Sequence, residues 1–195
     1  MTAAEKLHEQ EAGASVEDSL SASEDGFCVL SRRETFHTVE ETVSHVDENG
    51  VARTYLRKKS VDGLQLSVTY MDKDGREDCD GTFPSFTLYS KPTPYWGDPP
   101  KKLKETYSVH GVMYREGDLP SGLRWNEDGD LVHQAWTNKL GEIDRNGDKP
   151  AEIDVDEFGS TIEFYKRGGL LMREDDKPAV VERNSAGVIV REEWY

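Results

Sequence analysis

A short phrase occurs three times in residues 105–195, and it limits the folds that this chain can adopt. In each copy an Arg is followed by an Asp three positions later and by a Pro five positions later. The copies begin 30 and then 28 residues apart. Such a period is typical of repeat proteins, whose units bury too little surface alone and are stabilised by stacking. The copies comprise Arg115, Asp118 and Pro120; Arg145, Asp148 and Pro150; and Arg173, Asp176 and Pro178.

Each phrase is followed by the signals of a β-hairpin. A Gly stands nine residues after each Pro and allows the backbone conformation of a tight turn. β-Branched and aromatic residues flank the turn, as in residues 150–155 and 161–165. We therefore expect residues 105–195 to form three tandem hairpin repeats of about 28–30 residues in an antiparallel sheet.

The Arg and the Asp of the phrase have two interpretations. In the structural one, the Asp carboxylate accepts hydrogen bonds from turn amides, and the Arg guanidinium bridges to it or to a neighbouring repeat. In the functional one, the Arg side chains form a ladder that binds a ligand. We favour the structural interpretation.

Residues 27–90 have the pattern of a β-meander. Polar and apolar side chains alternate over residues 35–46, and Asn49-Gly50 favours a hairpin turn. Further strands are expected over residues 51–58, 64–71 and 83–89. Since nothing after residue 12 has helical periodicity, we predict an all-β protein with an elongated, twisted antiparallel sheet.

Two segments lack the signals of a sheet. Residues 1–26 have almost no large apolar side chain and predict a disordered acidic tail, with a short helix over residues 2–11 or folding on a partner as the alternatives. Residues 91–104 contain four of the eight Pro residues and predict a linker or loop. This linker divides residues 27–90 from the repeats, although one sheet could continue across it.

The formal net charge of −15 is unevenly distributed. Residues 1–26 carry seven acids and one Lys, which gives −6, and residues 105–195 carry twenty acids and eleven bases, which gives −9. Such a surface repels phosphate backbones, so we do not expect nucleic-acid binding. It suits solubility alone, a basic protein partner or imitation of DNA.

The chain offers no signal of a membrane segment or of a metal site. No apolar run approaches the ~20 residues of a membrane-spanning helix, and the N-terminus has no secretory signal, so we expect a cytoplasmic protein. We interpret Cys28 and Cys79 as reduced thiols, with a single disulfide as the alternative. The five His residues are scattered and neither Cys lies in a CxxC motif, so we predict no metal and no cofactor.

No nucleophile, phosphate-binding or dinucleotide motif occurs, and we predict no enzymatic activity. The candidates for binding are aromatic. A repeat-spaced series should line one sheet face, as a core stripe or as an exposed strip for a partner. It comprises Tyr107, Trp125, Trp136, Phe164, Tyr165, Trp194 and Tyr195. Tyr95 and Trp96 lie in the Pro-rich loop and are either folded back onto the protein or available to a partner. The binding candidates are therefore Tyr95, Trp96, Trp125, Trp136, Tyr165 and Trp194.

The repeat resembles short β-hairpin repeats of the MORN type, in the variety found in bacteriophage, giant-virus and bacterial proteins. The stretch from Tyr165 to Ala179 matches best, that from Trp136 to Ala151 is similar, and that from Tyr107 to Ser121 is weaker. Residues 70–84 resemble a degenerate fourth copy in which Gly75, Arg76, Asp80 and Pro84 have irregular spacing.

This chain departs from the family pattern at two positions. The family has a Gly immediately before the Pro and a His immediately before the Arg, and both residues are replaced in every copy of this chain. The replacements are Leu119, Lys149 and Lys177, and Tyr114, Asp144 and Met172. The resemblance implies a scaffold or contact surface of viral or mobile-element origin, without catalysis.

We therefore expect a non-enzymatic interaction or inhibitory module that is encoded by a phage and binds a host or viral protein, in the host cytoplasm. The first alternative is an acidic DNA mimic that inhibits a DNA-binding protein, and the second is an enzyme of unrecognised type. Because a single-layer sheet leaves edges uncovered, we also expect that the chain can form homo-oligomers.

Overall fold

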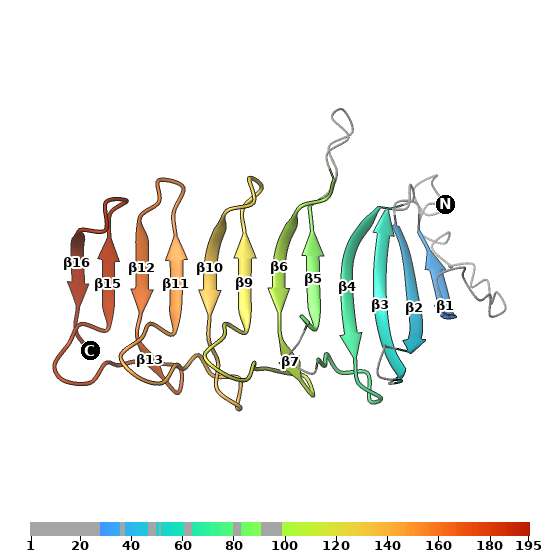
Figure 1. The fold of residues 1–195 in the computed structure, drawn as a ribbon, viewed down its shortest axis with the longest axis horizontal. Coiled ribbons are helices and arrows are strands. Elements are labelled where there is room, and N and C mark those ends of the chain that lie inside the picture. The colour runs from blue at the N-terminus through green and yellow to red at the C-terminus, as the bar shows by residue number, and fades with distance from the viewer. Residues whose placement is uncertain are drawn as a thin grey trace, which may run out of the picture.

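The computed structural model describes residues 28–35, 38–46, 50, 52–60, 64–79, 83–90 and 99–195. Within them the regular structure is entirely β, and twelve strands form one antiparallel sheet in chain order (Figure 1). The prediction of an all-β antiparallel meander is therefore confirmed. The tail predicted at residues 1–26 and the alternative helix at residues 2–11 lie outside the described residues.

The large sheet is a single layer. Two small hairpins lie along one side of it, where the ends of successive strands are connected, and this side is called the small-hairpin end (Figure 1). The strands of the large sheet are β1 (Cys28–Glu34), β2 (Thr38–Val46), β3 (Ala52–Ser60), β4 (Gln65–Met71), β5 (Phe86–Tyr89), β6 (Lys102–Thr106), β9 (Gly122–Trp125), β10 (Leu131–Ala135), β11 (Glu152–Val155), β12 (Thr161–Phe164), β15 (Val180–Arg183) and β16 (Ile189–Glu193). The small hairpins are β7 (Ser108–Val109) with β8 (Val112–Met113), and β13 (Lys166–Arg167) with β14 (Leu170–Leu171).

The sheet continues across the predicted linker. Strand β6 begins at Lys102, inside the segment 91–104, and pairs with β5 through Phe86 and Thr106. It also pairs with β9, the first strand of the repeats. The two halves that the sequence suggested are thus parts of one sheet, and residues 91–98 lie outside the described part.

The core is thin, because a single layer has no second sheet to pack against. In the C-terminal half its centre is Tyr165, Ala179 and Val181, with Leu171 of the small hairpin beside them. In the N-terminal half, Val43 and Tyr55 are buried. Stability must therefore come from many local junctions between neighbouring strands.

Backbone hydrogen bonds define a fourth copy of the repeat. In each copy the amide of an aromatic residue donates to the carbonyl of the residue that follows the Pro. These bonds are Tyr70 to Ser85 (2.7 Å), Tyr107 to Ser121 (2.8 Å), Trp136 to Ala151 (2.9 Å) and Tyr165 to Ala179 (2.8 Å). The repeat thus begins at Tyr70, one unit before the first complete phrase.

The hydrogen bonds also correct the alignment of this early copy. The amide of Asp78 donates to the carbonyl of Tyr70, as the amide of Asp144 does to that of Trp136. The next residue, Cys79, therefore takes the place of Arg145, and in the sequence Thr82 takes the place of Asp148. Matching Arg76 and Asp80 to the Arg and the Asp of the phrase was wrong in register.

The turns along the small-hairpin end alternate in form. Gly75 and Gly141 close the longer turns, where their amides donate to the carbonyls of Asp72 and Asn138. The copies beginning at Tyr107 and Tyr165 instead have the two-stranded hairpins β7–β8 and β13–β14. The number of residues between the aromatic residue and the start of the phrase therefore alternates as well.

Candidate functional site at the repeat junctions

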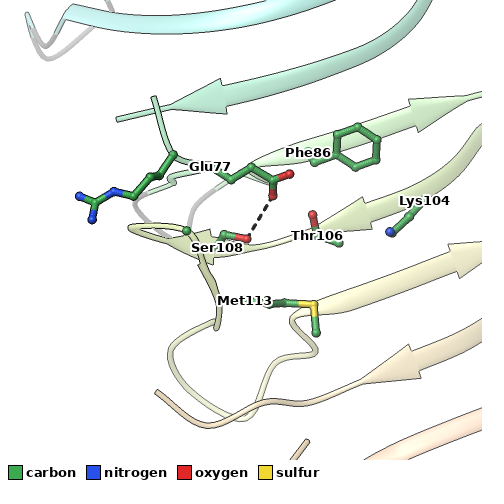
Figure 2. A pocket seen from close by; sticks show the side chains of 8 residues that line it. Glu77, Phe86, Lys104, Thr106, Ser108 and Met113 are labelled. Atoms are coloured by element: carbon green, nitrogen blue, oxygen red, sulfur yellow. Dashed lines mark hydrogen bonds between the residues drawn. The ribbon is translucent and has the colours of Figure 1, made fainter. Parts of the chain in front are cut away.

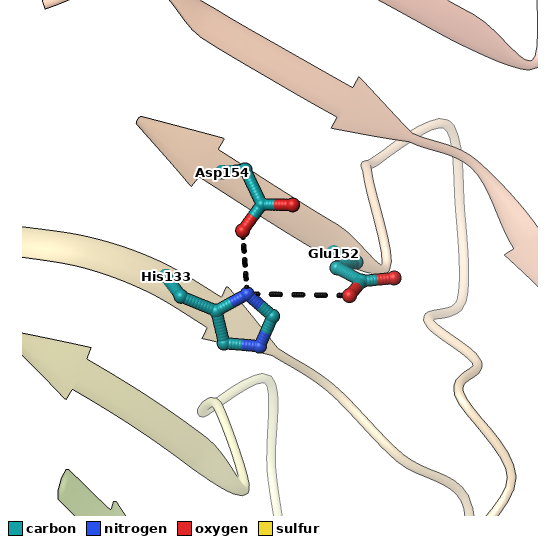
Figure 3. A group of neighbouring side chains, drawn as sticks. All are labelled: His133, Glu152 and Asp154. Carbon is teal, nitrogen blue, oxygen red and sulfur yellow. Dashed lines mark hydrogen bonds and ion pairs between the residues drawn. The ribbon is translucent and has the colours of Figure 1, made fainter. Parts of the chain in front are cut away.

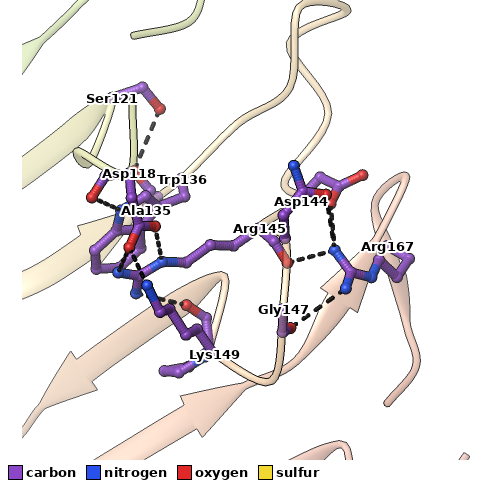
Figure 4. Close-up of polar contacts among 11 residues, drawn as sticks. Asp118, Ser121, Ala135, Trp136, Asp144, Arg145, Gly147, Lys149 and Arg167 are labelled. Carbon is purple, nitrogen blue, oxygen red and sulfur yellow. Dashed lines mark hydrogen bonds and ion pairs between the residues drawn. The ribbon is translucent and has the colours of Figure 1, made fainter. Parts of the chain in front are cut away.

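The Arg of the second and third phrases joins two successive repeats. The guanidinium carbon of Arg145 lies 3.8 Å from the centroid of the Trp136 ring, and its Nη1 donates to the carbonyl of Pro150 at 3.1 Å. Its Nε and Nη2 donate to the two carboxylate oxygens of Asp118, at 2.6 and 3.1 Å (Figure 4). Of the two bridges that we considered, the guanidinium makes the one to the neighbouring repeat.

The next junction repeats this geometry. The guanidinium carbon of Arg173 lies 3.7 Å from the ring centroid of Tyr165, and its Nη1 donates to the carbonyl of Pro178 at 3.3 Å. Its Nε donates to Asp148 at 2.5 Å. One side chain therefore covers an aromatic ring, holds a turn carbonyl and neutralises the carboxylate of the preceding repeat.

Each of the two carboxylates also pairs with a Lys. Lys149 donates to Asp118 at 2.5 Å, and Lys177 donates to Asp148 at 2.9 Å. The hydrogen bonds from Arg173 and then from Lys177 lower the pKa of Asp148 from its ordinary 3.8 to about 2. Arg145 and then Lys149 hold the pKa of Asp118 lower still. Both acids are ionised at any ordinary pH and are paired with cations.

Figure 4 also shows how the following repeat holds the loop of the phrase. Arg167 of the small hairpin donates to the carbonyls of Arg145 (2.5 Å) and Gly147 (3.3 Å) and pairs with Asp144 at 3.3 Å. The loop is therefore fixed from both sides, which keeps the Arg145 guanidinium in place over Trp136.

The first phrase makes an incomplete junction. The guanidinium carbon of Arg115 lies 3.6 Å from the ring centroid of Tyr107, and Nη1 donates to the carbonyl of Pro120 at 3.4 Å. Its Nε is buried and has no hydrogen-bond partner among the residues that the structure describes. The register accounts for this, because the sequence has Thr82 where the later copies have the Asp.

The last phrase also makes an incomplete junction. In the described part of the chain it has the aromatic ring and the Asp, but it has no Arg to cover the ring. The indole Nε1 of Trp194 donates to the carbonyl of Asp176 at 3.1 Å, as that of Trp136 does to Asp118 at 3.4 Å. Trp194 is therefore the next aromatic residue of the series. It is 58% exposed, whereas Trp136 beneath its Arg is 6% exposed. In the described part of the chain, no guanidinium covers Trp194 and no cation pairs with Asp176.

The aromatic candidates for binding thus fall into different classes. Trp136 and Tyr165 are buried by the Arg of their own repeat. Trp125 is half-buried, with the amine of Lys102 5.3 Å from its ring centroid. Trp194 alone of these four is exposed. Tyr95 and Trp96 lie outside the described residues.

An open depression of about 580 Å³ lies on one sheet face beside β5 and β6 (Figure 2). Phe86 and Lys104 line it from the strands, and the amine of Lys104 is 5.7 Å from the Phe86 ring centroid. Glu77 lies at its rim and accepts hydrogen bonds from Ser85 and Ser108, at 3.5 and 3.3 Å. Its charged groups are thus engaged with neighbouring side chains rather than directed at one point.

His133, Glu152 and Asp154 form a cluster that the spacing of the sequence did not indicate (Figure 3). Register brings them together, since His133 lies opposite Asp154 on adjacent strands. The His133 Nδ1 is 2.7 Å from Asp154 and 4.0 Å from Glu152. These three groups could hold a metal ion, but Lys166 already pairs with Glu152 at 2.6 Å. The cluster therefore has the form of a cross-strand row of paired polar side chains.

Both cysteines are free thiols, and Cys79 is buried. The described residues contain no helix that is long and apolar enough to cross a membrane. Comparison of the chain with protein-family models, with curated proteins and with solved structures finds no match.

Proposed function

We propose that this protein is a non-enzymatic protein–protein interaction module that binds its partner through the outer edge of β16. The observation that carries the proposal is a group of exposed apolar side chains at this end of the sheet. Soluble proteins seldom expose such a group without a partner for it. Its members are Val188, Ile189, Val190, Trp194 and Tyr195.

The position of these side chains favours a polypeptide as the partner. β16 is the last strand in the order of the described sheet, and β15 pairs with one of its edges only. An uncovered strand edge offers amide and carbonyl groups that a second chain can pair with, while neighbouring apolar side chains supply contact area. A small molecule would leave most of this edge uncovered.

The likeness to viral MORN-type repeats extends the proposal. By it the protein is phage-encoded, acts in the host cytoplasm and binds a host or viral protein as an inhibitor or adaptor. Imitation of DNA is the weaker proposal, because Asp118 and Asp148 are both neutralised by an Arg and a Lys. Regularly spaced free carboxylates, as in a phosphate backbone, would have favoured it.

A matched pair of variants tests the proposal. Val190→Lys places a charge on the β16 edge, and Leu140→Lys places the same charge on an exposed turn at the small-hairpin end. Tagged wild type and both variants would be used for quantitative affinity capture from host lysate. We expect Leu140→Lys to retain the wild-type partner and Val190→Lys to lose it. Identical capture by all three proteins would refute binding through β16.

A further inference from the structure

We infer that the β16 edge receives a partner strand that carries the same phrase as this chain: an Arg, a Pro five residues later, and then Ala or Ser. The inference rests on the proposed function and names the chemistry of the partner. Its occupant is a polypeptide built from this type of repeat, whose Arg covers Trp194 and pairs with Asp176. The bound strand would complete a junction of the kind that this chain forms internally.

The internal junctions specify what the partner must supply. At Trp136 and at Tyr165, the incoming segment brings an Arg over the ring, at 3.8 and 3.7 Å, and bonds the same Arg to the preceding Asp. The carbonyl after its Pro accepts the amide of the aromatic residue. The residue that offers this carbonyl is small and almost fully buried, as Ala151 and Ala179 are.

The β16 end presents the receiving half of that junction. Trp194 is held by the carbonyl of Asp176, as Trp136 is held by that of Asp118. Asp175 has a φ of 63°, in the left-handed region also occupied by Gly117 and Gly147 at the same place in the earlier phrases, so the turn keeps its form. Asp176 itself departs from Asp118 and Asp148 in having a positive φ, of 53°.

Charge and shape favour Arg over any other side chain in the partner. The receiving surface combines the flat face of an indole with a carboxylate, and residues 105–195 have a net charge of −9 from twenty acids and eleven bases. A planar guanidinium can stack on the ring and donate to the carboxylate at once, whereas a Lys amine cannot do both in that geometry. An apolar side chain would leave Asp176 without a cation.

The register of β15 against β16 shows which strand sequence fits. Val181 lies opposite Glu192, and Glu182 lies opposite Arg191. A second strand with the sequence of residues 180–183 on the outer edge would meet the same two residues of β16, and its Glu would face Arg191. A peptide with the sequence of residues 173–183 therefore carries the phrase and a compatible strand.

The test is titration of the full-length protein with this peptide, capped at both ends. The readout is the indole N–H signal of Trp194 in the ¹H–¹⁵N NMR spectrum, identified by its absence from Trp194→Phe. We expect a saturable shift of this signal. We expect the peptide with Arg173→Ala to bind at least about tenfold more weakly, because it lacks both the stacking and the charged hydrogen bond.

Two controls separate this junction from nonspecific binding. The Asp176→Asn protein, whose spectrum should otherwise match wild type, is expected to bind the peptide several-fold more weakly. A peptide with Ala179→Leu should lose most of its affinity, since the residue at this position is almost fully buried in the internal junctions. Equal binding of the wild-type and Arg173→Ala peptides would overturn the inference, as would no shift of the Trp194 signal. So would concentration-dependent pairing of the protein through β16 that excludes the peptide.

The outcomes distinguish this inference from the proposed function. If Val190→Lys loses a protein partner but the phrase peptide does not bind, the edge is an interaction surface of different chemistry and only the inference fails. If the peptide does not bind and Val190→Lys loses no partner, both fail. Binding of the peptide that depends on Arg173 and on Asp176 supports the inference directly.

Discussion

The Arg of the second and third phrases has three structural roles. Arg145 contacts an aromatic ring, a turn carbonyl and the carboxylate of the preceding repeat, and its side chain is largely buried. Much of the Trp136 surface is shielded from water by this guanidinium rather than by a second layer of protein. The cation therefore substitutes for part of a hydrophobic core.

Replacement of Arg145 by Ala should accordingly destabilise the fold. We expect the free energy of unfolding, measured by urea denaturation, to fall by about 2 kcal/mol, because stacking and charged hydrogen bonds are lost together. Arg124→Ala is the control: its guanidinium is exposed and lies 3.9 Å from Asp154, so we expect a change below about 0.5 kcal/mol. A variant Arg145→Ala with wild-type stability but no partner binding would instead assign the Arg ladder to ligand recognition.

The unpaired Nε of Arg115 gives a prediction of the opposite sign. By the repeat register, Thr82→Asp supplies the carboxylate that the later junctions have. We expect it to raise the free energy of unfolding by about 1.5 kcal/mol, the lower end of the usual net value of a hydrogen bond between charged groups. In the Arg115→Ala background the same substitution should have no stabilising effect, and a double-mutant cycle measures the difference. An equal gain in both backgrounds would show that Thr82 acts elsewhere.

At the level of the strands and hairpins, the sequence predicted the fold class because turn residues and alternation are local signals. The Gly residues nine positions after each Pro do close hairpins, and Gly129 and Gly159 both have positive φ. The fourth copy was misaligned because Cys79 stands where the others have Arg, and because the turns alternate in length. Only the backbone hydrogen bonds of Tyr70 resolve that register.

The candidate site was harder to derive from the sequence. The identity of the key side chains was predictable, since the phrase repeats, but two facts depended on register. The sequence could not show that Arg145 reaches back to Asp118, 27 positions earlier, rather than to Asp148 of its own phrase. It also could not distinguish the covered Trp136 from the exposed Trp194, because both are aromatic residues at the same place in the repeat.

At the scale of the whole molecule, the sheet has many junctions and little core, so charge pairing should control its response to acid. The pKa of Asp148 in the folded state, about 2, is below its ordinary value of 3.8, and that of Asp118 is lower. A carboxylate with a depressed pKa stabilises the fold fully above the unfolded-state pKa and loses this contribution as the pH falls through the folded one.

We therefore expect the urea midpoint to be steady above about pH 5 and to fall between pH 4 and pH 2. The double variant Asp118→Asn, Asp148→Asn should have a lower midpoint at pH 7 and a smaller further loss between pH 4 and pH 2. If wild type and this variant lose stability equally over that interval, other acidic groups dominate the response.

The direction of the Arg–Asp bridge has a consequence for how such a chain can change in length during evolution. Each unit brings the cation for the unit before it and the anion for the unit after it. Deletion of one whole period, such as residues 146–173, would leave Arg145 paired with Asp118 and followed by a new phrase that ends in Pro178. Duplication of one whole period would likewise create one more complete junction. A gene of this kind can therefore gain or lose units by unequal recombination without any compensating point mutation.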